Sequence, residues 1–347
     1  NERGTNYNPQ PTPTGFKLGA NRSATNYNGE TYIYMAIRRG PLAAPTDATK
    51  VFTPVLGDGS GTPSIKTTNH ITDFGIAHNK TGGGTVVGTR LLGTNQLKTH
   101  TTGAEAANSY FNWDFQNGWH TWTGLNTNYI NWNWKRAPSF FDVVAFSGNS
   151  TSGRTVSHNL GVAPELMIVK RRTGGGASWT TYVSDLGATK YLRVNNTNAV
   201  ATSSGFWNNT APTSSVFTVG NDADVNGSGE DYIAYLFATV AGVSKVGSYT
   251  GTNSSLTIDC GFGGSGARFV LIKRTNSTGN WWLFDSVRGI VSGYDASLNL
   301  DNTNAEDSTV DWIDPHSSGF TLPPTAAGGG DNDVNISGAE YIFYAIA

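Results

Sequence analysis

The sequence has little of what several protein classes depend on. It contains one cysteine, Cys260, so it can form neither an intramolecular disulfide nor a zinc site built on paired cysteines. Charged residues make up only 14% of the chain and the net charge is −2, so no basic excess exists to neutralise nucleic-acid phosphates. No apolar run approaches the roughly 18 residues that a membrane-spanning helix needs. We therefore expect no nucleic-acid partner and no membrane span.

Glycine and small polar residues are abundant instead. The 347 residues include 43 glycines, together with many Asn, Ser and Thr residues, while aromatic side chains make up 12%. Long-chain helix formers such as Lys and Glu are scarce. This composition is typical of short strands joined by polar turns.

A closing motif recurs along the chain and reveals an internal repeat. Its four copies are TYIYMAI (31–37), NYINWNW (128–134), DYIAYLF (231–237) and EYIFYAI (340–346). Successive copies lie about a hundred residues apart, which is the size of a β-sandwich domain. The motif therefore predicts domains of one size, each ending on the same strand.

Six further segments precede the closing motif in each full period. The third segment, for example, reads ELMIVKRR (165–172) in one period and RFVLIKRT (268–275) in the next. In the fifth segment an alanine always follows a leucine by seven residues, as in Leu192 and Ala199. Short alternating segments separated by turn residues predict an all-β fold of tandem antiparallel β-sandwiches, jelly-roll or Ig-like, of about 100 residues each.

The periodicity also predicts the domain boundaries. We expect a partial repeat, a terminal hairpin, over 1–40 and full repeats over 41–138, 139–240 and 241–347. The joints between repeats are short, which favours a rod-like array over freely flexing domains. Residues 1–40 match only the last two segments of a repeat, so we expect the chain to be a piece of a longer polypeptide or to begin in a degenerate repeat.

The residues that usually carry catalysis show no pattern here. The six histidines are never at metal-ligand spacing, and no nucleophile elbow, phosphate loop or paired-carboxylate signature occurs. His158 falls at the place that Cys260 and Thr67 take in the other repeats, which favours a structural histidine. We therefore predict a protein without enzymatic activity, catalytic residues or cofactor.

Two acidic stretches resemble part of a calcium loop. In DADVNG the side chains of Asp222, Asp224 and Asn226 match the first ligand positions, and Asp331 and Asp333 form the equivalent pair in the last repeat. The position of the bidentate glutamate is taken by Ile233, however, so turn formation by Asx residues is the better interpretation. Calcium remains an alternative, and otherwise no metal is expected.

Ten tryptophans raise the question of sugar binding, since sugar rings stack on exposed aromatic side chains. Trp132 and Trp134 share a strand face with Ile130 and are predicted to lie in the core. Trp113 and Trp122 are the better candidates for exposure. They are our predicted binding residues for a host-surface glycan.

Several long phrases resemble a repeat found in virion-associated, tail-fibre-like proteins of marine tailed bacteriophages. These are YIYMAIRRGP (32–41), FFDVVAFSG (140–148), RTVSHNLGVAPELMIVKRR (154–172), GSGEDYIAYLFATVAGVSKVGSYTG (227–251), ARFVLIKRT (267–275) and SSGFTL (317–322). The resemblance covers nearly the whole chain, with 41–138 as the most divergent part. It implies a component of the extracellular phage particle and carries no catalytic residues to transfer.

Three functions follow as expectations. The first is a structural virion protein, in a tail fibre or similar appendage for host attachment or, as the nearest variant, in head decoration. Its partners would be other virion proteins and copies of itself, as a homotrimer by analogy with fibres. The second is a module that binds host-surface carbohydrate. The third, a polysaccharide depolymerase, lacks a convincing acidic pair.

Overall fold

The computed structural model describes residues 10–12, 15–18, 27–35, 43–57, 64–107, 111–113, 115–121, 127–264, 266–324 and 334–347. Its regular structure is nearly all β, and every strand pair is antiparallel, which confirms the predicted all-β class. None of the helices in this described part has the length and hydrophobicity for crossing a bilayer.

We call residues 41–138, 139–240 and 241–347 repeats 1, 2 and 3. Repeat 1 contains η1 (Ala48–Lys50), β3 (Phe52–Leu56), β4 (Ser64–Thr67), β5 (Phe74–Asn79), β6 (Thr85–Thr89), β7 (Asn95–Lys98), β8 (Ala106–Ala107), β9 (Gly118–Thr121) and β10 (Tyr129–Trp134). Repeat 2 contains β11 (Phe141–Ser147), β12 (Arg154–Ser157), β13 (Leu166–Arg171), β14 (Thr180–Val183), η2 (Ser184–Leu186), β15 (Lys190–Arg193), β16 (Ala201–Thr202), α1 (Ser204–Trp207), β17 (Val216–Val219), α2 (Ala223–Asn226) and β18 (Asp231–Phe237). Repeat 3 contains β19 (Ser244–Thr250), β20 (Leu256–Asp259), β21 (Phe269–Arg274), β22 (Trp281–Asp285), β23 (Asp295–Asn299), β24 (Asp307–Val310), β25 (Asp314–His316), β26 (Gly319–Leu322) and β27 (Glu340–Ile346).

Each repeat forms one six-stranded sheet, with the same topology in all three repeats, and one small sheet of two or three strands. The large sheets have the orders β3-β10-β5-β6-β7-β8, β11-β18-β13-β14-β15-β16 and β19-β27-β21-β22-β23-β24. The closing strand is second in each, paired with the first and third strands of its own repeat. The small sheets are β4-β9, β12-β17 and β20-β26-β25.

In repeats 2 and 3 the closing strand is apolar on both faces because both faces are buried. In β18 the side chains of Ile233, Tyr235 and Phe237 belong to a core cluster that spans the molecule. Their neighbours Tyr232 and Leu236 point the other way, into a second core between the large sheet and the small sheet of repeat 2. Strands buried on two sides read as continuous apolar runs, which explains the motif that reveals the repeat.

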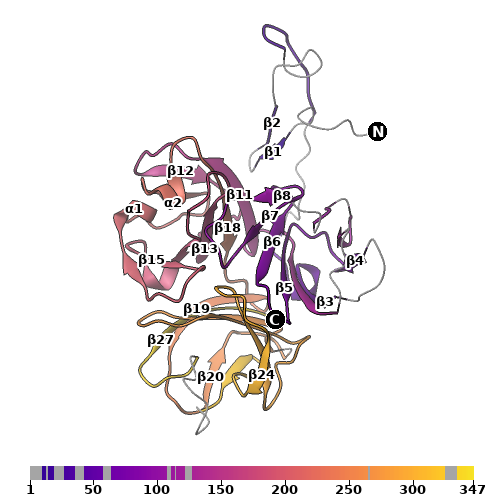
Figure 1. Ribbon diagram of the computed structural model, residues 1–347, viewed down its shortest axis with the longest axis vertical. Coiled ribbons are helices and arrows are strands. Elements are labelled where there is room, and N and C mark those ends of the chain that lie inside the picture. The colour runs from indigo at the N-terminus through magenta and orange to yellow at the C-terminus, as the bar shows by residue number, and fades with distance from the viewer. Residues whose placement is uncertain are drawn as a thin grey trace.

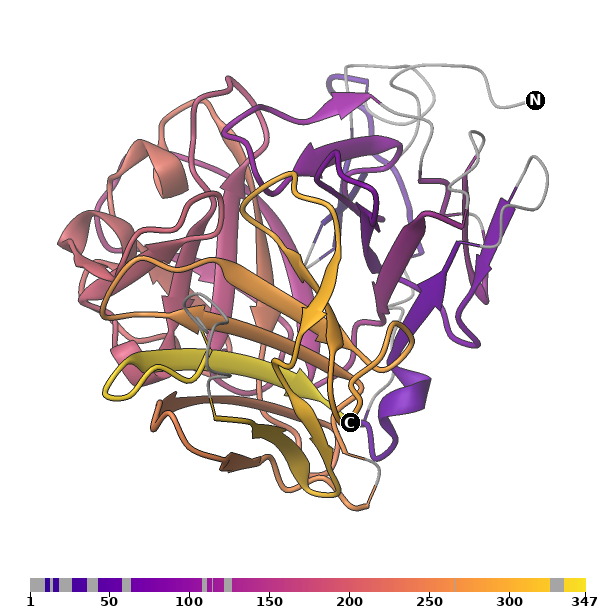
Figure 2. The same cartoon turned by 60° about the horizontal axis from the view of Figure 1, so that its bottom comes forward.

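The three large sheets face one another around a shared core, and the predicted rod is wrong. The spanning cluster contains buried residues of all three repeats, including Phe74, Tyr235 and Phe269. Figure 1 shows the repeats as three lobes around a centre, and Figure 2 shows their sheets meeting there. Short joints are also compatible with a closed ring, because a head-to-tail interface closes if its rotation allows.

The predicted closing strand of the partial repeat at 31–37 is not formed in its described residues. Residues Thr31–Met35 belong to no strand, and the side chain of Ile33 is fully exposed. A hairpin pairs β1 (Gln10–Thr12) with β2 (Gly15–Lys17) instead. In the full repeats this strand lies between a first and a third strand, and residues 1–40 have no matching segments to supply either.

Candidate functional site

The three repeats are joined by contacts that repeat around the ring. We call the contacts between repeats 1 and 2, 2 and 3, and 3 and 1 the 1–2, 2–3 and 3–1 seams. At each seam one backbone N–H donates to a backbone carbonyl oxygen of the next repeat, at 2.8 Å. The three bonds run from Glu105 to Arg172, from Val200 to Thr275 and from Glu306 to Lys80, and the three acceptors occupy equivalent positions in their repeats. Because the third bond returns to repeat 1, the interface is head-to-tail and closes after three units.

Buried lysines reinforce two of the seams. Lys170 of repeat 2 and Lys273 of repeat 3 occupy equivalent positions in the third strand, and both are fully buried. The ammonium group of Lys273 donates to the carbonyl oxygens of Thr197 and Gly279, at 2.9 and 2.6 Å. Lys170 likewise donates to a carbonyl oxygen of the preceding repeat, that of Thr102, at 3.2 Å. Buried charges need such partners, so the lysines tie each sheet to its neighbour.

A tryptophan stands beside each lysine and adds a second bond. The indole N–H of Trp179 donates to the carbonyl oxygen of Lys98, and that of Trp281 donates to that of Arg193, at 3.0 and 2.9 Å. Both bonds cross a seam. Both indoles are buried, and the N–H of each has a specific partner in the neighbouring repeat.

Repeat 1 makes the equivalent contact with different chemistry. Its third strand carries His78 where the third strands of repeats 2 and 3 have lysine. On the neighbouring strand, Thr85 is paired with His78, whereas in repeat 3 the residue paired with Lys273 is Trp281. Nε2 of His78 lies 3.2 Å from the carbonyl oxygen of Asn299 in repeat 3, and Nδ1 lies 3.0 Å from that of Asn79. A neutral ring has one N–H and satisfies only one of these acceptors.

Burial sets the protonation of these groups. It lowers the pKa of His78 to about 4, with further lowering by Arg288, against the two carbonyl oxygens that favour the charged ring. It also lowers the pKa of Lys170 to about 8, with Arg171 acting in the same direction. At neutral pH the 3–1 seam therefore holds a neutral imidazole, where the 1–2 seam holds an ammonium that is largely protonated.

The 3–1 seam has an additional buried network. The indole N–H of Trp132 in repeat 1 donates to Asp285 of repeat 3 at 3.0 Å. Asp285 also pairs with Arg288 at 2.5 Å, and both side chains are almost fully buried. The Arg288 guanidinium stacks over the Trp132 ring, 5.5 Å from its centroid, and reaches Glu306 at 3.1 Å. The Trp132 indole thus joins repeat 1 to an ion pair, Asp285–Arg288, that is buried within repeat 3.

Residues 65–347, which include every strand of the ring except β3 and the first residue of β4, match a family described as a domain of unknown function (DUF7483). The chain belongs to the DUF7483 family. No curated protein and no solved structure matches it. Since the match runs through all three repeats, the region that defines the family includes all three seams.

The sequence did carry a signal for the seams in this DUF7483 protein. The third segments share a lysine at equivalent places, Lys170 and Lys273, and the fifth segments share the phrase NTNA at 196–199 and 302–305. Thr197 and Thr303 in that phrase accept hydrogen bonds from the next repeat, from Gly279 and Gly83. The spacing of leucine and alanine thus marks the loop that crosses each seam.

The predicted calcium residues are engaged within the fold. Asp222 caps α2 by accepting the N–H of Asp224, and the Asp224 carboxylate pairs with Arg193 at 3.2 Å. Asn226 is fully buried, and its amide donates to the carbonyl oxygens of Thr151 and Gly220. Within the described ranges no cluster of three His, Cys, Asp or Glu side chains is placed to hold a metal ion. Asp331 and Asp333 lie outside the described residues.

The prediction that Trp113 is exposed is wrong. Its side chain is 6% exposed and stacks on Phe111, with ring centroids 5.3 Å apart. The reason is a cross-strand pair of glycines, Gly75 and Gly88, which leaves a gap on the sheet. A Cβ on Gly88 would lie 2.5 Å from the Phe111 ring, so the aromatic cluster fills the place of two side chains. Trp122 lies outside the described residues.

Other predicted interior residues behave as expected. Trp132 and Trp134 are at most 1% exposed, which confirms their core assignment. Nε2 of His158 lies 3.1 Å from the carbonyl oxygen of Thr213, and Nδ1 accepts the N–H of Leu160. Cys260, at the equivalent place, is buried, and burial raises the pKa of its thiol to about 12. The thiol is therefore protonated and a poor nucleophile at neutral pH.

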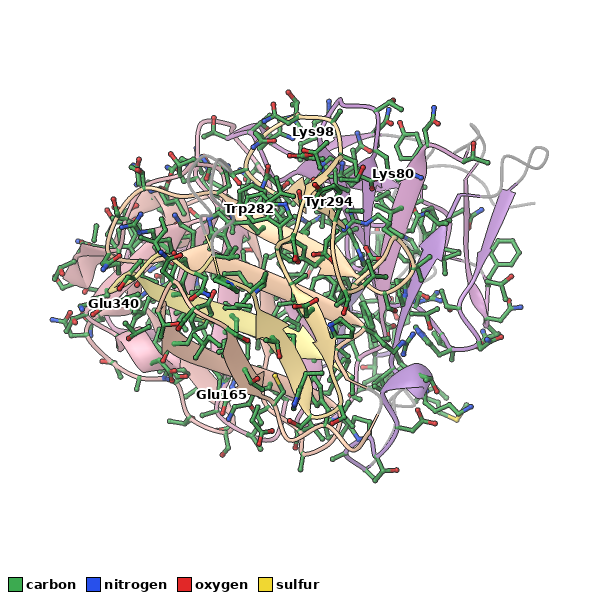
Figure 3. The ribbon with its side chains drawn as sticks, turned by 90° about the horizontal axis from the view of Figure 1, so that it is seen from below. Lys80, Lys98, Glu165, Trp282, Tyr294 and Glu340 are labelled. Carbon is green, nitrogen blue, oxygen red and sulfur yellow. The ribbon has the colours of Figure 1, made fainter. Side chains whose placement is uncertain are left out.

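A polar groove of about 410 Å³ lies where repeats 2 and 3 meet. Its walls carry the carboxylates of Glu165, Asp185 and Asp259, the ammonium group of Lys245 and the hydroxyl of Ser248. Ser248 donates to Asp185 at 2.7 Å, across the two repeats. Glu165, labelled in Figure 3, accepts the backbone N–H and the hydroxyl of Thr239. The groove presents hydrogen-bond donors and acceptors to a polar ligand.

Proposed function

We propose that the chain is a non-enzymatic structural component of a bacteriophage virion, within a tail fibre or similar appendage that takes part in host-surface attachment. The proposal starts from the resemblance of its sequence to repeats in phage virion proteins. One structural observation supports it, the closure of three sandwiches on a single core. Such closure fixes the repeats relative to one another, as a spacer between particle and host requires.

The seams supply this rigidity. Each repeat is held to both others by backbone hydrogen bonds, and two of the three seams also contain a buried ammonium group. Relative motion of the repeats would leave these donors without partners in an apolar interior, at about 1–3 kcal/mol for each buried group. In this proposal the partners are neighbouring virion proteins and further copies of the chain, as a homotrimer.

Localisation on the particle tests the proposal. Gold-labelled antibodies against the chain should decorate the tail appendages of purified phage whose genome encodes it, seen by electron microscopy. Label on the head would favour head decoration instead. Intact particles that carry no label, while the protein accumulates in infected cells, would overturn a virion role. Antibody binding to detergent-opened particles is the control for a buried epitope.

Carbohydrate binding is a second candidate, and the polar groove between repeats 2 and 3 favours it. Sugar hydroxyls both donate and accept hydrogen bonds, and the groove supplies Lys245 as donor with Asp185 and Asp259 as acceptors. This places the candidate site away from Trp113, whose buried ring has no face for stacking.

Titration calorimetry with host-envelope polysaccharide tests this second function. Lys245→Ala should weaken binding by at least about tenfold, because one charge-assisted hydrogen bond contributes roughly 1.5–3 kcal/mol and about 1.4 kcal/mol is a factor of ten. Lys190→Ala, a change at an exposed lysine outside the groove, is the matched control. Equal affinity of wild type and Lys245→Ala, or no heat with any polysaccharide, would reject the groove as a glycan site.

A further inference from the structure

The three seams are similar in geometry but differ in how the chain connects them. Repeats 1 and 2 are joined by the turn Ala137–Phe141, and repeats 2 and 3 by the turn Val240–Ser244. Repeat 3 and repeat 1 are held together by side-chain and backbone contacts alone, chiefly those of Trp132, Asp285 and Arg288. The ring can therefore open at the 3–1 seam without breaking a covalent bond.

The two joints adopt the same turn with different strain. In each, a backbone N–H bonds back three residues, from Phe140 to Ala137 and from Val243 to Val240. The third residue of each turn has a positive φ, 73° for Gly242 and 61° for Ser139. Glycine adopts this conformation freely, whereas in a residue with a side chain it costs roughly 1–2 kcal/mol of conformational free energy. The joint before repeat 2 is the strained one.

We propose that repeat 1 exchanges between two copies of the chain, with Ala137–Phe141 as the hinge. In the exchanged dimer, repeat 1 of each copy occupies the repeat 1 position of the other. The partner is a second copy of this chain, because its repeats 2 and 3 present the same surface that repeat 1 binds within its own chain. Both the 1–2 and 3–1 seams form again with all their contacts. This inference does not depend on the proposed virion role.

Energetics favour exchange during folding over exchange from the native ring. An exchanged dimer makes the same seam contacts as two monomers, so it differs by the cost of association and by relief of the turn at Ser139. Opening a finished ring would expose the shared core, which contains Phe74, Phe141 and Phe237 in contact across the 1–2 seam. Exchanged dimers should therefore arise on refolding and then persist.

Refolding the full chain from denaturant at low and high protein concentration tests the inference, with mass measured by light scattering after size exclusion. We expect a dimer fraction that rises with concentration and does not dissociate on dilution. Ser139→Gly should reduce that fraction severalfold, because it removes the strain at the hinge. Ser150→Gly is the matched control, a serine at φ 56° outside both joints, and should leave the fraction unchanged.

Three outcomes would overturn the inference. One is a purely monomeric product at every refolding concentration. Another is a dimer that forms from concentrated native protein and dissociates on dilution, which would indicate ordinary surface association. The third is an equal dimer fraction in wild type and Ser139→Gly, provided that both variants show the wild-type tryptophan emission of a closed core.

Discussion

Repeat 1 differs from repeats 2 and 3 in the side chains that donate hydrogen bonds across its seam. In repeats 2 and 3 a buried lysine and a neighbouring tryptophan supply the donors that cross the seam, as Lys273 and Trp281 do. In repeat 1, His78 and Thr85 take these places, and the imidazole lies where it meets the carbonyl oxygen of Asn299. The acceptors are backbone carbonyl oxygens, which are present whatever the side chain at that position. What is retained around the ring is therefore a set of acceptors, and the donor varies.

The largest expected effect is the loss of a seam lysine. Lys273→Ala removes the buried stem and both hydrogen bonds, so we expect a loss of about 4 kcal/mol in unfolding free energy. Urea denaturation followed by tryptophan fluorescence measures it. Lys190→Ala, at an exposed lysine, should change stability by less than about 0.5 kcal/mol. A Lys273→Ala protein as stable as the control would mean that the seam does not depend on its ammonium group.

The next effect depends on pH and is specific to repeat 1. Since the folded pKa of His78 is about 4 against 6.5 for a free side chain, the unfolded chain binds the extra proton between these values. Stability from this group is complete above pH 6.5 and falls as pH drops toward 4, by about 3 kcal/mol at 1.36 kcal/mol per pKa unit. His70, whose pKa burial also lowers to about 4, adds a second contribution of the same sign.

His78→Gln isolates the contribution of that one histidine. Burial raises the pKa of Asp295 to about 6, so its contribution has the opposite sign and is lost as pH rises from about 4 to 6. The difference between wild type and His78→Gln cancels both Asp295 and His70. We expect the wild type to lose more stability between pH 6.5 and 4 by chemical denaturation. Parallel curves would show that His78 does not titrate at the seam.

A smaller effect is expected from the seam indole alone. Trp281→Phe keeps the aromatic packing and removes the donor to Arg193, so we expect a loss of about 1.5 kcal/mol. Trp134→Phe changes a comparably buried indole that faces the shared core, and separates loss of volume from loss of the bond. Equal destabilisation of the two variants would assign the effect to volume.

The smallest expected effect comes from placing the donor pair of repeats 2 and 3 in repeat 1, which compares the repeats directly. His78→Lys and Thr85→Trp together install the donor pair of repeats 2 and 3 in repeat 1. Each single change places a group without its companion, and His78→Lys also adds a cation near Arg288. We expect the double variant to be more stable than the sum of the singles by about 1 kcal/mol, from a double-mutant cycle. Additivity would show that the two positions act independently.

Part of this architecture could be predicted from the sequence and part could not. Strand alternation and the recurring closing motif predict the sheets because they report local burial, as in Ile233 and Tyr235. The ring could not be predicted, since the matching lysines Lys170 and Lys273 indicate a common environment without saying which repeat supplies the acceptor. Trp113 was misjudged because the gap it fills is made by Gly75 and Gly88, which come together only through strand pairing.

The groove was missed for a related reason. Glu165 and Asp185 belong to repeat 2, whereas Lys245 and Asp259 belong to repeat 3, and nothing in either stretch marks them as neighbours. Gly247, opposite Phe343 on the adjacent strand, also contributes to the groove, where the equivalent position of repeat 2 carries Val144.

The shared core also constrains how the chain is made. The second strand of the last large sheet, β27, follows every other described strand in the sequence, and its Tyr344 packs in the shared core against Phe237 of repeat 2. During synthesis, the apolar inner faces of repeats 1 and 2 therefore remain partly exposed to solvent until β27 has been synthesised. A ribosome that pauses in repeat 3 leaves a nascent chain with two thirds of a core, which is the form most in need of a chaperone.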